Sequence, residues 1–129
     1  MRPRRAVCGP ALTSPRGLQR LLATCEAFLS HVERRVFPGG CFFVAAASDA
    51  GTHPGPVRDS IAVQQRDWDE VLERLAREAT EHGELPPGTN PTQLAFELHA
   101  LMAAANNAFI LHGDVGAFER ARVAIRERL

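Results

Sequence analysis

The chain has 129 residues, 45% of them hydrophobic, which is enough for one domain with a real core. Its 15 Arg balance 15 Asp and Glu, so the zero net charge argues against a broad basic surface for DNA or RNA. No apolar run approaches the roughly 20 residues of a membrane span, and three widely spaced Cys exclude a disulfide framework. We expect a small cytoplasmic domain that does not contact a membrane.

The first residues are basic and irregular, and they predict a disordered or linker tail over residues 1–14. Ser14 and Pro15 then resemble an N-cap and a first helical position, so the folded domain is expected over residues 15–129. Apolar residues at helical spacing predict an amphipathic helix from here to the Pro-Gly-Gly that begins at Pro38.

A short apolar segment, Cys41 to Ser48, follows this first helix. Periodicity does not separate a buried strand from a buried helix in so short a run, but its three consecutive Ala favour a helix. The next segment, Pro56 to His82, carries an apolar stripe that begins at Val57, and Gly83 follows it as a helix stop.

Two more helices are predicted at the C-terminal end of the chain. Asn90 and Pro91 open one helix, which runs to about His112 and stops at Gly113. Asp114 is expected to cap the last one, which continues to Leu129. The predicted fold class is therefore all-α, a five-helix domain without a sheet.

The helix over residues 91–112 is apolar on two faces, and a helix of this kind must be buried nearly all round. One domain of this size covers one face, so the second face predicts a two-fold dimer in which the last two helices of each chain form a four-helix interface. The alternative is a central helix in a monomeric bundle. The candidate interface residues are Phe96, Ala100, Ala103, Ile110, Phe118, Ala121 and Ile125.

The sequence carries no convincing catalytic or metal site, and no enzyme activity or cofactor is expected. Ser48, Asp49 and His53 lie too close in sequence for the geometry of a catalytic triad. None of the five His has a partner at i,i+3 or i,i+4, as a helical metal site needs. A buried, inert thiol is the favoured interpretation of Cys41.

Large apolar residues on the predicted inner faces suggest a small-molecule pocket, with Asn106 as a polar anchor beside them. A filled core is the alternative from periodicity alone. The candidate pocket residues are Phe28, Phe42, Phe43, Trp68, Leu72, Leu98, Met102 and Asn106.

Four segments read in order carry a family resemblance: Gly40-Cys-Phe-Phe-Val-Ala-Ala-Ala47, Pro54-Gly-Pro-Val-Arg-Asp59, Ala79-Thr-Glu-His-Gly-Glu-Leu85 and Gln93-Leu-Ala-Phe-Glu-Leu98. Together they resemble the C-terminal domain of TetR/AcrR-family transcriptional regulators. The resemblance implies dimerisation through the last two helices and a small apolar or aromatic effector bound between the preceding ones.

The chain departs from that family at its N-terminus, because residues 1–14 are too short for a helix-turn-helix. We therefore expect a homodimer that contacts DNA only through a helix-turn-helix domain missing from this chain. Two other functions fit the same features. The chain could be an interaction protein that heterodimerises with an intact relative, or a helical carrier of small apolar ligands.

Overall fold

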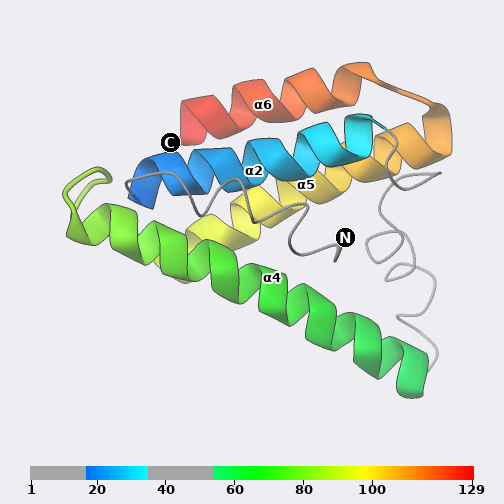
Figure 1. The fold of residues 1–129 in the computed structure, drawn as a ribbon, viewed down its shortest axis with the longest axis horizontal. Coiled ribbons are helices and arrows are strands. Elements are labelled where there is room, and N and C mark those ends of the chain that lie inside the picture. The colour runs from blue at the N-terminus through cyan, green and yellow to red at the C-terminus, as the bar shows by residue number, and fades with distance from the viewer. Residues whose placement is uncertain (1–16, 35–53) are drawn as a thin grey trace.

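The computed structural model describes residues 17–34 and 54–129. These residues form four helices and no strand: α2 (Gly17–Glu33), α4 (Pro56–Glu81), α5 (Pro91–His112) and α6 (Gly116–Arg128). α2 and α5 each contact both α4 and α6, and they contact one another. They therefore lie between α4 on one side of the bundle and α6 on the other (Figure 1). The all-helical class is confirmed, whereas the fifth predicted helix, Cys41 to Ser48, lies outside the described residues.

Local signals at the ends of α4 and α5 explain why these two helices have the predicted bounds. Pro56 opens α4, and Gly83 follows its end in a left-handed conformation with φ of 72°. At α5, the Asn90 side chain accepts hydrogen bonds from the backbone N–H groups of Thr92 and Gln93, at 3.0 and 3.1 Å. Gly113, with φ of 63°, ends the helix.

The start of α6 differs from the prediction. Val115 occupies the N-cap without a side-chain cap, and α6 begins at Gly116. The carboxylate of Asp114, predicted to cap this helix, instead accepts a hydrogen bond from Arg120 at 2.9 Å. An ion pair with a guanidinium has replaced the cap because Arg120 lies within reach on the first turns of α6.

The core forms where α2, α4, α5 and α6 meet, and it is built from aliphatic side chains with Phe109 and Phe118 at one end. α2 approaches α4 closely at Gly17, where a Cβ atom would lie 2.5 Å from the backbone nitrogen of Ala79. Further along the same helix pair, the rings of Phe28 and Trp68 pack with their centroids 5.7 Å apart. Val57, predicted on the buried stripe of α4, is 66% exposed and lies far from these contacts.

Within the described residues, α5 is the one helix that is both long enough and apolar enough to span a membrane, judged by length and composition alone. One of its faces is nevertheless packed in the core against the other three helices. This packing is typical of the central helix of a bundle.

Candidate effector pocket and dimer face

Six of the eight predicted pocket residues lie within the described part of the chain, and the apolar ones among them belong to the core or pack against it. Phe28 comes from α2, Trp68 and Leu72 from α4, and the others from α5. Leu72, Leu98, Met102 and Asn106 are all at most 1% exposed, and Trp68 is half-buried at the edge of this cluster. Phe42 and Phe43 lie outside the described residues.

Among the residues that the structure describes, the buried polar side chains are Thr24, His31 and Asn106. The Thr24 hydroxyl donates to the backbone oxygen of Arg20 at 2.7 Å. Burial, and to a smaller extent the charge of Arg34, lowers the pKa of His31, which therefore favours the neutral form. Asn106 was predicted because it interrupts an apolar face, whereas Thr24 and His31 were missed because single polar residues on α2 carry no such signal.

The nearby thiol of Cys25 has no reactive character. The side chain is 1% exposed, and this burial raises the pKa of the thiol to about 12. Because the thiolate is the nucleophile, Cys25 behaves as a small apolar core residue.

The second apolar face of α5 lies on the surface of the described bundle. Phe96 and Leu111 are 69% and 73% exposed, and Ala100 is exposed with them. Ala103 and Ile110 are partly buried on the same face. The described residues of this chain therefore cover one face of α5 and leave the other available.

The predicted interface residues on α6 occupy a different position, because Phe118, Ala121 and Ile125 lie in the chain's own core at 0–4% exposure. The Phe118 ring packs against Phe109 of α5, with centroids 5.4 Å apart. The apolar stripe of α6 thus holds this helix on its own bundle. The apolar side chain that α6 exposes is Val123, at 40%.

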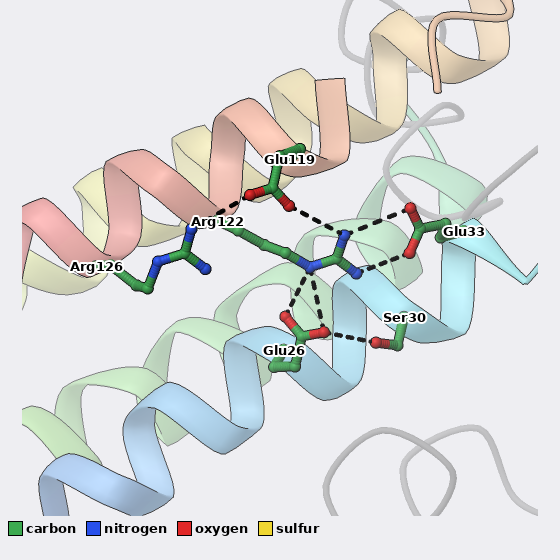
Figure 2. Close-up of polar contacts among 6 residues, drawn as sticks. All are labelled: Glu26, Ser30, Glu33, Glu119, Arg122 and Arg126. Carbon is green, nitrogen blue, oxygen red and sulfur yellow. Dashed lines mark hydrogen bonds and ion pairs between the residues drawn. The ribbon is translucent and has the colours of Figure 1, made fainter. Parts of the chain in front are cut away.

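A cluster of charges joins α6 to α2 (Figure 2). Nε of Arg122 donates to both carboxylate oxygens of Glu26, at 3.1 and 2.8 Å, and Nη2 donates to Glu33 at 2.8 Å. Burial alone would raise the pKa of Glu26, but hydrogen bonds from Arg122 and Ser30 outweigh it and lower the pKa. The hydrogen bonds that Arg122 donates to Glu33 and Glu26 raise the pKa of its guanidinium in turn, so Glu26 and Arg122 both favour their ionised forms.

A groove of about 310 Å³ lies between α4 and α5, away from the predicted pocket. Nδ1 of His99 and Oδ1 of Asp69 are 2.5 Å apart there and join the two helices. The groove reaches Phe96 and Ala100, so it borders the exposed face of α5. Sequence reasoning missed it, because it depends on the register between two helices. Its lining residues are Asp69, Glu73, Thr92, Ala95, Phe96, His99 and Ala100.

Over residues 17–34 and 54–129, no three His, Cys, Asp or Glu side chains lie close enough to hold a metal ion. The family model of the tetracyclin repressor-like C-terminal domain matches residues 17–125, and the chain belongs to this family. Such domains generally dimerise and bind small-molecule effectors, and they are generally not enzymes. A comparison with curated proteins gave no match.

Proposed function

We propose that this chain is the effector-sensing and dimerising domain of a TetR-type cytoplasmic transcription regulator, with DNA bound by a helix-turn-helix domain that is not part of these 129 residues. The observation that carries the proposal is the position of α5. One face of this helix contributes Leu98, Met102 and Asn106 to the interior, and the opposite face exposes Phe96 and Leu111.

This position couples two events through one rigid element. A ligand that enters beside Met102 must displace side chains of α5, because the site is close-packed. A displacement of α5 moves its exposed face by a similar amount, and with it the second copy bound there. The effector thus changes the geometry of the dimer. This coupling requires only that the effector bind one of the two dimer arrangements more tightly than the other.

The chemistry of the interior favours an apolar or aromatic effector with one hydrogen-bonding group. The lining is aliphatic and aromatic, from Phe28, Trp68 and Leu72 among others. Asn106, also buried, is the polar residue among them and stays the predicted anchor for the ligand.

Sedimentation equilibrium tests the dimer part of the proposal. The wild-type chain is expected to dimerise, and Phe96→Arg is expected to raise the dimer dissociation constant at least about tenfold because it places charge in an apolar contact. Val63→Arg is the matched control, since Val63 is also an exposed apolar residue, 52% exposed, but lies on α4. Equal effects of the two variants, or a monomeric wild type, would contradict the proposed interface.

Fluorescence of the apolar probe anilinonaphthalenesulfonate, with Trp68 as energy donor, tests the effector site. We expect saturable binding that weakens about tenfold in Met102→Phe, because the larger ring overpacks the interior at a cost of about 1–3 kcal/mol. Leu111→Phe adds similar volume on the exposed face and is expected to leave probe affinity unchanged. If Met102→Phe leaves the affinity for the probe unchanged, the probe binds somewhere other than the proposed interior site.

A further inference from the structure

The groove between α4 and α5 holds two carboxylates and little positive charge to balance them. Asp69 contacts His99, while Glu73 forms no ion pair within the described residues. α4 as a whole carries four Arg against seven Asp and Glu. The groove therefore favours a cationic occupant, and its walls of Ala95, Ala100 and the Phe96 ring suit the aliphatic part of a long basic side chain.

The position of the groove on α5 is set by helical spacing of about 100° per residue. Thr92 and His99 lie on the flank of α5 that faces α4. Glu97, which pairs with Arg128 of α6 at 3.1 Å, lies on the opposite flank. The exposed face with Phe96 and Ala100 lies between these flanks, so any helix that covers it and avoids α6 must lie along the groove.

α6 has net positive charge, with four Arg against two Glu, and its two sides differ. Arg122 and Arg126 share the side that faces α2, where they meet Glu26, Glu33 and Glu119 (Figure 2). On the other side, Arg120 shares a surface with the exposed Val123 and is paired with Asp114 in a contact open to solvent. Arg120, with 74% of its side chain exposed, is thus the basic group that α6 presents outward beside an apolar contact.

In a two-fold four-helix bundle of α5 and α6 pairs, the helices alternate around the axis, so each α5 has its own α6 on one flank and the second copy's α6 on the other. We propose, resting on the dimer proposed above, that the acidic α4–α5 groove receives the Arg120 guanidinium from α6 of a second copy of this chain. The contact occurs twice in the dimer. It orients the two copies by pairing Glu73 and Asp69 with a cation at the border of the apolar face.

Charge reversal with mixed chains tests this contact by fluorescence-detected sedimentation. Glu73→Arg and Arg120→Glu are each expected to raise the homodimer dissociation constant about tenfold, since each places like charges together at both contacts. A mixture of the two variants is expected to form a heterodimer of near wild-type affinity, because both of its contacts then pair opposite charges. Glu70→Arg on α4 and Arg126→Glu on α6 are the charge-matched controls outside the contact.

The outcomes separate this contact from the dimer itself. Loss of each homodimer with recovery in the mixture supports the contact, provided that circular dichroism shows the helices intact. A wild-type dimer unaffected by Glu73→Arg, or variants that do not recover on mixing, would overturn the contact and leave the dimer of the proposed function standing. A wild-type monomer would overturn both.

Discussion

At the scale of single residues, the buried His31 side chain of α2 affects how the domain responds to acid. His31 is 5% exposed, and burial lowers its pKa below the ordinary value of 6.5. Unfolding restores the higher pKa, so the unfolded chain binds the proton more tightly. The contribution of neutral His31 to the free energy of unfolding is complete above pH 6.5. It is lost as the pH falls through the lowered pKa that His31 has in the folded state.

We therefore expect the free energy of unfolding to decrease as the pH falls below 6.5, and His31→Gln to flatten this part of the curve. Urea unfolding at a series of pH values measures it, with the exposed His112→Gln as control. A second loss of stability follows below the ordinary carboxyl pKa of 4.5, where Glu26 is protonated in the unfolded chain first. If the free energy of unfolding falls with pH as steeply in His31→Gln as in the wild type, protonation of His31 does not destabilise the folded state.

At the scale of helices, the crossing of α2 over α4 depends on the absence of one side chain. A Cβ on Gly17 would lie 2.5 Å from the nitrogen and 2.9 Å from Cα of Ala79, and backbone atoms cannot move aside as side chains do. Gly17→Ala is expected to cost about 1–3 kcal/mol by overpacking, although Ala is the better helix former. Gln19→Ala, on the exposed side of α2, is the control in a thermal-unfolding comparison. A stabilised Gly17→Ala would mean that the two helices sit further apart.

The helices that sequence predicts well are those whose ends are encoded locally. Asn90, Pro91 and Gly113 bound α5 through contacts a few residues long, and Pro56 with Gly83 does the same for α4. Contacts between distant residues were not predicted, because periodicity reports which face is apolar but not what that face meets. The same spacing that predicted Phe118 at a dimer interface is satisfied by its packing on Phe109 within one chain.

The candidate site shows the same difference between features that local sequence patterns predict and contacts between distant residues, which they do not predict. Leu72, Leu98 and Met102 were predicted as inward-facing because each continues a helical stripe, and they are interior. Asn106, predicted as a polar anchor beside them, is interior as well. The Asp69–His99 contact spans 30 residues and the Arg122–Glu26 contact 96, and neither has a local pattern that could reveal it.

At the scale of the whole molecule, the uncovered face of α5 is where the proposed function expects a second polypeptide to bind. The proposed function expects the native protein in its source cells to be heavier than 14.1 kDa by on the order of 50 residues or more, the size of a small domain. Intact mass measurement of the native protein decides this. A mass of 14.1 kDa would instead favour the heterodimerising protein or the ligand carrier.

The Arg122 cluster also bears on the order in which the chain folds. Its hydrogen bonds to Glu26 close a loop of 96 residues, which carries a large entropic cost before any contact forms. α4, α5 and α6 each contact a helix next to them in the described order, and these local contacts are favoured early. We therefore expect the docking of α6 on α2 to follow the rate-limiting barrier. In stopped-flow measurements, Arg122→Met should raise the unfolding rate about tenfold and leave the folding rate unchanged. By this prediction, Arg122 governs how long the folded domain persists rather than how fast it forms.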